Sequence, residues 1–137
     1  MYPLELVKPM SKDLTDFGFI GLSSPEEVSD VLDKEDGTLL LVVNSVCGCA
    51  AANARPAAKM AIRHSKKPDA LYTVFAGVDK AATEKAREYL LPYPPSSPSI
   101  ALFKDGKLVH MIERHHIEGR SAHMIAENLV TAFEAYC

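Results

Sequence analysis

Two cysteines separated by a single glycine, Cys47, Gly48 and Cys49, are the residues of this sequence that most clearly indicate chemistry. A near-continuous apolar run, TLLLVVN over residues 38–44, precedes them, and an alanine-rich, helix-forming stretch follows. Cys47 therefore falls where a strand ends and a helix begins. Backbone N–H groups and the helix dipole at such a junction favour the thiolate, which is the nucleophilic form of cysteine.

Cys49 lies two residues after Cys47, a spacing at which the side chains of a regular helix do not face each other. A Cys47–Cys49 disulfide would close a small ring and would need distorted geometry, which Gly48 makes possible. A strained disulfide is easier to reduce and therefore more oxidising. The pair suits a protein that accepts disulfides or thiol adducts from other molecules better than it suits a general strong reductant.

Two other interpretations of the cysteine pair were weighed against redox chemistry. Small cysteines can simply fill a core, although two at a strand-to-helix corner are hard to explain in that way. A structural zinc site needs four ligands, usually from two close pairs. The sequence has no second Cys-x-Cys or Cys-x-x-Cys, so such a site would have to recruit Cys137, His115 or His116. We therefore predict a redox-active pair and no metal site.

The composition predicts one globular domain over residues 1–137, with 47% hydrophobic and 24% charged residues. A formal net charge of −3 gives no sign of a nucleic-acid or anionic-membrane partner, since both require a basic patch. No apolar run approaches the roughly 20 residues that span a bilayer, and the start of the chain lacks the pattern of a secretory signal. We therefore expect a cytoplasmic protein, in a compartment where structural disulfides are rare.

The remaining segments predict the elements that must position the cysteines. Strands are predicted over residues 38–44, 71–79, 99–103 and 107–113. Helices are predicted from Ser24 onward and over 47–66, 80–91 and 121–137, with a kink at Pro56. This order of helix, strand, helix, strand, helix, strand, strand and helix predicts an α/β protein whose mixed sheet has helices on both faces.

The same order of elements resembles the thioredoxin fold, in which a cis-proline begins the third strand and lies against the cysteines. Pro98 in SPSIALFKDGKLV matches that proline, and Ser97 precedes it. The segments NSVCGCAAANARPA and FKDGKLVHMIERHHIEGR are similar to the bacilliredoxin family, described also as thioredoxin-like C-G-C disulfide isomerases. The similarity runs over nearly the whole chain. It implies a single thioredoxin-like domain, with residues 1–22 as an N-terminal extension packed on it.

Bacilliredoxins remove the low-molecular-weight thiol bacillithiol from S-thiolated proteins. The resemblance therefore implies that the Cys47 thiolate attacks the mixed disulfide and that Cys49 or a second small thiol resolves the adduct. Gly48, Ser97 and Pro98 would contact the substrate. The client protein and bacillithiol would be the partners, no further cofactor would be needed, and a flavoprotein reductase would regenerate the thiol. We expect a potential above the roughly −270 mV of thioredoxin.

Two further functions were considered, namely a protein disulfide isomerase or oxidant, and a metal or sulfur carrier that uses the two thiolates. Three other features had open roles. His115 or His116 could donate a proton or tune the reactive cysteine, although a solvated or capping pair is the preferred interpretation. Arg55 could bind a carboxylate of the small thiol or pack beside the helix kink. Cys137 could resolve the first cysteine, but we expect a terminal residue to be idle.

Overall fold

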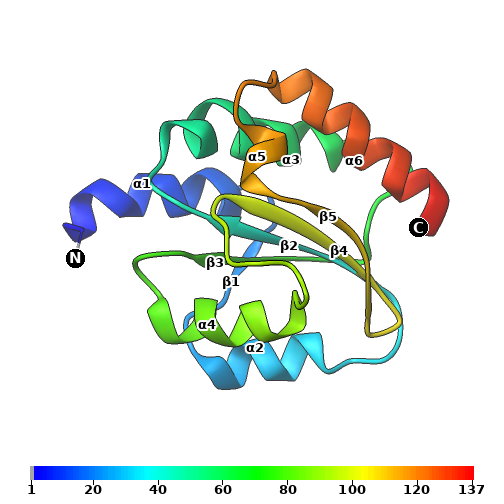
Figure 1. Ribbon diagram of the computed structural model, residues 1–137, viewed down its shortest axis with the longest axis horizontal. Helices are drawn as coiled ribbons and strands as arrows, with labels where there is room; N and C mark the ends of the chain where they lie inside the picture. Colours follow the sequence, from blue (N-terminus) through cyan, green and yellow to red (C-terminus); the bar gives the residue numbers. More distant parts are fainter. Residues whose placement is uncertain (1) are drawn as a thin grey trace.

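The computed structural model describes residues 2–137, and they form a five-stranded mixed sheet with helices on both faces (Figure 1). The strands lie in the order β1-β3-β2-β4-β5, with β1, β3 and β2 parallel and β2, β4 and β5 antiparallel. The strands are β1 (Ile20–Gly21), β2 (Thr38–Asn44), β3 (Ala70–Phe75), β4 (Ser99–Lys104) and β5 (Lys107–Ile112). The helices are α1 (Leu4–Thr15), α2 (Pro25–Leu32), the π-helix η1 (Ala50–Ala54), α3 (Arg55–Ala61), α4 (Lys80–Tyr89), α5 (Arg114–Ile117) and α6 (Ala122–Tyr136). None of these helices is long and apolar enough to cross a membrane.

Strand β2 lies at the centre of the sheet, and its side chains alternate between two apolar cores. Leu40 and Val42 belong to the core under α1, α3 and α6, whereas Leu41 and Val43 belong to the core under α2 and α4 (Figure 1). Both faces of the strand are buried, which is why its sequence is a continuous apolar run. The predicted mixed sheet with helices on both faces is confirmed.

The strand bounds follow the sequence pattern closely, with one clear difference. β2 has the predicted bounds, but the strand predicted over 71–79 ends at Phe75. The N–H groups of Val78 and Asp79 both bond to the Phe75 carbonyl, and Gly77 takes a φ of +84°. The chain therefore turns directly after Phe75 to enter α4.

The helix predicted over 47–66 begins at Gly48 and ends at Ala61, and its winding changes along its length. The π-helix η1 occupies the first part, and Pro56 is the second residue of α3. A proline has no N–H to donate to the preceding turn, and wider turns of this kind inside helices are frequent at functional sites. The disturbance expected at Pro56 thus takes the form of a π-helical segment just before it.

The N-terminal segment contributes a helix and a strand that the sequence pattern did not predict. Of the extension predicted over residues 1–22, Met1 lies outside the described residues. β1 joins the edge of the sheet by pairing Ile20 with Tyr72 of β3. In α1 only Val7 and Leu14 are buried, and a proline lies inside the helix. Such a short apolar pattern gives little helical periodicity to detect.

Candidate active site

The two cysteines lie at the first turn of the helix that follows β2. Cys47 is the residue just before this turn, and its carbonyl accepts hydrogen bonds from the N–H groups of Ala50 and Ala51 at 2.9 and 3.3 Å. Its Sγ accepts a hydrogen bond from the N–H of Cys49 at 3.4 Å. The two sulfurs are 2.6 Å apart. The spacing argument against facing side chains fails here, because it applies only inside a regular helix and Cys47 precedes one.

Gly48 lies exposed between the two cysteines. Its φ is outside the left-handed region, and a Cβ at this position would meet no atom within 4 Å. With both cysteines free, the backbone does not require glycine here. A side chain at this exposed position would meet no residue other than its two neighbours in the chain.

The pKa of the Cys47 thiol lies below its ordinary value. The largest cause is the hydrogen bond from the Cys49 thiol, which outweighs the opposing effect of partial burial. The N–H groups of Cys49 and Ala50 and the positive charge of Arg114 lower the pKa further. Each of these groups favours the thiolate, so Cys47 is the more nucleophilic of the two cysteines.

Cys49 has the opposite character. Burial, the hydrogen bond to Cys47 and the negative charge on that sulfur together raise the pKa of Cys49 to about 11. The last two causes depend on Cys47 being a thiolate. When Cys47 is bonded to another sulfur these causes disappear, and the pKa of Cys49 then falls.

Arg114, the first residue of α5, is the charged side chain that reaches the reactive sulfur. Its Nη2 donates to the Sγ of Cys47 at 3.3 Å, and its Nη1 donates to the carbonyl of Ser97 at 3.2 Å. Its Nε bonds to the carboxylate of Glu118 one turn later. The carboxylate and the carbonyl thus fix the fork of the guanidinium, which directs one nitrogen at the thiolate.

Arg55 contacts the chain where it leaves β2, and it is only 4% exposed. Its Nη1 donates to Asn44 Oδ1 at 2.9 Å and to the carbonyl of Ser45 at 3.0 Å, and its Nε bonds to Asp13 at 3.1 Å. Lys59 bonds to the other oxygen of Asp13. With its guanidinium buried and engaged, Arg55 supports the packing interpretation and not the binding of a carboxylate.

Ser97 and Pro98 lie beside the cysteine loop because β4 runs antiparallel to β2. Val43 pairs with Ser99, so the chain just before Ser99 lies beside the chain that leaves β2. The Ser97–Pro98 peptide bond is cis, and Pro98 is buried. The Ser97 carbonyl shares the Arg114 guanidinium with the reactive sulfur. The structure therefore brings all five predicted site residues to one end of β2 and β4.

A cavity of about 320 Å³ borders the reactive sulfur. Cys47 and Ser97 line it, together with Tyr2 from the N-terminal segment and two arginines, Arg87 and Arg114. Within residues 2–137, no acidic residue belongs to its lining. The space next to the nucleophile is therefore electropositive.

Within residues 2–137, neither of the two histidines after β5, His115 and His116, bonds to a cysteine. The Nδ1 of His116 accepts a hydrogen bond from the N–H of Glu113 at 3.1 Å and caps α5, and burial lowers its pKa. His115 is exposed. Glu113, His115 and His116 place one ligand atom each within 4.8 Å of one another, but this group includes neither cysteine. The geometry supports a capping and solvated pair.

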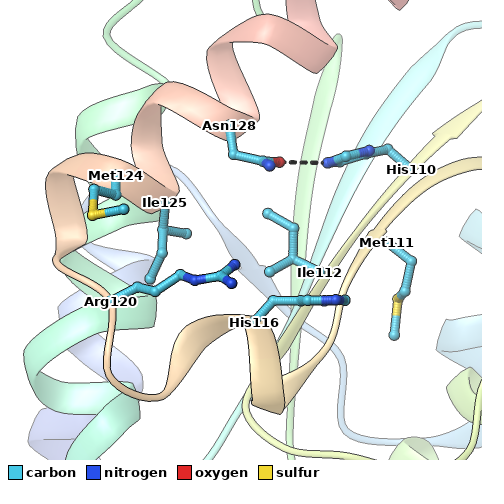
Figure 2. Close-up of a pocket in the computed structure, with 8 residues that line it drawn as sticks. All are labelled: His110, Met111, Ile112, His116, Arg120, Met124, Ile125 and Asn128. Atoms are coloured by element: carbon cyan, nitrogen blue, oxygen red, sulfur yellow. Dashed lines mark hydrogen bonds between the residues drawn. The ribbon is translucent and has the colours of Figure 1, made fainter.

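His116 instead lines a separate pocket of about 460 Å³ between β5 and α6 (Figure 2). Figure 2 shows His116 and Arg120 beside Ile112, and His110 bonded to Asn128 at 2.6 Å. Neither of the two cysteines lines this pocket.

Cys137 lies at the far end of the central strand from Cys47. Burial raises the pKa of its thiol, which contacts Thr38 at the start of β2. Cys47 follows the other end of this seven-residue strand, and a strand of that length spans roughly 20 Å. Cys137 therefore cannot resolve a disulfide on Cys47 of the same chain.

Solved structures confirm the fold. Oxidised thioredoxin O2 from Arabidopsis thaliana superposes with a TM-score of 0.58 at 16% identity, over 86% of this chain and 96% of that one. At this level of identity the likeness concerns the fold alone.

Sequence relatives identify the family. The family described as "Disulphide isomerase" matches residues 2–137. A bacilliredoxin from Cytophaga hutchinsonii is 59% identical over 98% of both chains. This chain belongs to the bacilliredoxin family. A bacilliredoxin from Salinibacter ruber is 58% identical over 99% of this chain and 81% of that one. With the cysteine pair described above, the bacilliredoxin relationship and the thioredoxin fold make the chain a thiol-disulfide oxidoreductase.

Sequence reasoning missed the two arginines of the cavity. The sequence analysis gives Arg114 no role, although its spacing of four residues from Glu118 indicates an ion pair on one helical turn. Arg87 carries no local signal, because it lies on an ordinary amphipathic helix, α4. Its place beside Cys47 depends on how that helix packs against the sheet.

Proposed function

We propose that this bacilliredoxin removes bacillithiol from S-thiolated client proteins. The observation that carries the proposal is the setting of Cys47, whose Sγ meets a backbone N–H, the Cys49 thiol and the Arg114 guanidinium. These three donors stabilise a thiolate that borders the cavity of about 320 Å³. A stabilised and accessible thiolate is the nucleophile that attacks a mixed disulfide.

The reaction begins when the Cys47 thiolate attacks the bacillithiol sulfur of the client mixed disulfide. A bond forms between the Cys47 Sγ and that sulfur, and the bond to the client cysteine breaks. The client leaves as a thiolate and takes a proton from water, while bacillithiol remains on Cys47 as a mixed disulfide. Gly48, Ser97 and Pro98 border the incoming disulfide, and the free N–H groups of a substrate chain would meet the backbone before β4.

Two routes resolve the adduct. Cys49 can attack the Cys47 Sγ, which releases bacillithiol and leaves a Cys47–Cys49 disulfide; two further bacillithiol molecules then reduce this disulfide and leave as bacillithiol disulfide. Alternatively a second bacillithiol attacks the adduct, which frees Cys47 and forms bacillithiol disulfide for a flavoprotein reductase to reduce. The first route is favoured by the 2.6 Å separation of the sulfurs and by the fall in the pKa of Cys49 once Cys47 loses its charge. The cycle requires only the cysteine pair and bacillithiol.

The experiment uses the Cys49→Ser variant, which retains the nucleophile and removes the internal resolving thiol. The reduced variant is incubated with a client protein that carries a bacillithiol mixed disulfide, and intact and peptide masses are recorded. We expect a bacillithiol adduct on Cys47 and a client released as free thiol. An unmodified Cys47 with an unchanged client contradicts the proposal, and Cys47→Ser serves as the matched control.

A second candidate function is the isomerisation of protein disulfides, which the description of the matching family favours. The two functions differ in their need for Cys49. De-thiolation persists in part without Cys49, because external bacillithiol resolves the adduct. Isomerisation with escape from trapped intermediates requires both cysteines, so complete loss of activity in Cys49→Ser would favour it.

A further inference from the structure

Arg87 lines the cavity next to Cys47 and carries an unusual polar atom. Within residues 2–137, its Nε is the one buried side-chain nitrogen or oxygen without a hydrogen-bond partner. No salt bridge to Arg87 is found in this part of the chain either. Buried polar groups are almost always hydrogen-bonded, so one without a partner in a cavity-lining residue calls for an explanation.

The second arginine of the cavity already has partners. Arg114 bonds to Glu118, to the Ser97 carbonyl and to the Cys47 sulfur. Its positive charge therefore already stabilises the Cys47 thiolate. Arg87 is the cavity arginine whose Nε has no hydrogen-bond partner and which forms no salt bridge within residues 2–137.

The cavity fits a small anionic molecule. Its volume of about 320 Å³ lies at the lower end of the range for small-molecule sites. Among the described residues, its lining includes two arginines and no acidic side chain. A guanidinium recognises a carboxylate through two parallel hydrogen bonds, which a buried setting strengthens.

We propose that Arg87, assisted by Arg114, forms a subsite for the carboxylates of the small thiol and so determines which sulfur of a mixed disulfide Cys47 attacks. This inference rests on the proposed function, since it concerns the substrate of the same site. Bacillithiol carries a malate group, which supplies the carboxylates. The sequence left Arg55 open between this role and packing beside the helix kink, and the structure shows that side chain to be buried.

The subsite has a consequence for the direction of attack. A mixed disulfide offers two sulfurs, and attack on the client sulfur would join the client to Cys47 and release bacillithiol. Binding of the malate beside Cys47 places the bacillithiol sulfur next to the thiolate. The new bond then forms to that sulfur, and the client cysteine leaves as thiolate with the electron pair of the broken bond.

The test uses Arg87→Gln in the Cys49→Ser background, so that whichever adduct forms on Cys47 is retained. One client peptide is prepared as mixed disulfides with bacillithiol and with 2-mercaptoethanol, which has no carboxylate. The rate constant for reaction of Cys47 is measured for each mixed disulfide. We expect Arg87→Gln to lower the ratio of the bacillithiol rate constant to the 2-mercaptoethanol rate constant about tenfold, the size typical of a lost charge-assisted hydrogen bond. The fraction of Cys47 bonded to the client in place of bacillithiol should rise in the same variant.

Two matched variants separate charge from fold. Arg87→Lys keeps a positive charge and should retain most of the preference for the bacillithiol adduct. Arg63→Gln removes an exposed arginine at the end of α3 and should leave the ratio unchanged. Equal slowing of both adducts by Arg87→Gln, with an unchanged ratio and adduct distribution, would overturn the subsite.

A binding measurement keeps the subsite separate from the proposed reaction. S-methyl bacillithiol cannot undergo exchange, and its affinity for the reduced protein is measured by calorimetry with and without Arg87→Gln. About tenfold weaker binding in the variant supports the subsite even if de-thiolation is not observed. Equal affinity of the proteins with and without Arg87→Gln overturns the subsite. If the protein with Arg87 binds S-methyl bacillithiol but does not remove bacillithiol from the client, only the proposed function is overturned.

Discussion

Two arginines contact the segment from Asn44 to Cys47, and their surroundings give them different roles. Arg55 is almost fully buried and bonds to Asp13, Asn44 and the Ser45 carbonyl. Arg114 lies on the rim, nearly half exposed, and donates to the Cys47 sulfur. The comparison shows that burial and existing partners decide whether an arginine supports a reactive loop or acts on its chemistry.

The largest effect is expected from Arg55→Gln. The change removes a buried charge from three acceptors and should lower the free energy of unfolding by about 2–3 kcal/mol. Urea denaturation measures this loss. The pH dependence of Cys47 alkylation in the folded variant should keep its midpoint, because the donors to the sulfur are unchanged. A stable variant with a shifted midpoint would contradict the supporting role.

Asp13→Asn tests the same supporting region through its charge. Burial acts to raise the pKa of Asp13, but hydrogen bonds and charges from Lys59 and Arg55 outweigh it and lower the pKa below its ordinary 3.8. The ionised carboxylate therefore contributes stability that is complete above pH 3.8 and is lost as the pH falls through the lower folded value. We expect Asp13→Asn to cost about 1 kcal/mol at pH 7. The difference in the free energy of unfolding between Asp13→Asn and the wild type, measured by urea denaturation, should be smaller at pH 3. An equal difference at pH 3 and pH 7 would contradict a contribution from the ionised carboxylate.

Arg114→Gln tests the rim. Loss of the guanidinium should raise the pKa of Cys47, because a positive charge that favours the thiolate is removed. Alkylation of Cys47 by iodoacetamide at pH 7 should slow about threefold, as for an exposed charge pair, and its pH midpoint should rise. Added salt should narrow the difference from the wild type. Arg120→Gln, from the pocket of Figure 2, is the matched control. Equal rates for Arg114→Gln and the wild type would refute the contact.

The smallest effect is expected from Glu118→Gln. The Ser97 carbonyl still holds the Arg114 guanidinium when the Glu118 charge is removed, so we expect the contact with Cys47 and the thiolate to be largely retained. Burial is the main reason for the raised pKa of Cys49, and the negative charge of Glu118 adds to it. Its removal should lower the pKa of Cys49 and speed the release of bacillithiol from the Cys47 adduct by less than twofold. A quenched-flow time course of released thiol measures this, and slower release would contradict the assignment.

The reactive cysteine was accessible to sequence reasoning because its chemistry is local. An apolar run such as 38–44 forms a strand, the alanine-rich stretch forms a helix, and the junction supplies N–H groups to Cys47 wherever the strand lies in the fold. The hairpin at Lys104-Asp105-Gly106 was equally predictable, because an Asp-Gly pair between two apolar runs is typical of a hairpin turn. In the structure both Asp105 and Gly106 take the positive φ that such a turn requires. The family resemblance then assigned Pro98 to the same site, and the register of β4 beside β2 is consistent with that position.

The sequence by itself therefore determined the order of the elements from α2 to α6 apart from the short α5, the place of the cysteine pair and a setting that favours the thiolate at Cys47. The tertiary structure alone decided that Arg114 contacts the sulfur of Cys47 and that Arg87 lines the same cavity. It also decided that Arg55 is buried and that Cys137 lies at the other end of β2. The physical reason is distance along the chain. Hydrogen bonds within a helix or turn join residues a few positions apart, whereas these contacts depend on how β4, α4 and α5 pack around the central strand.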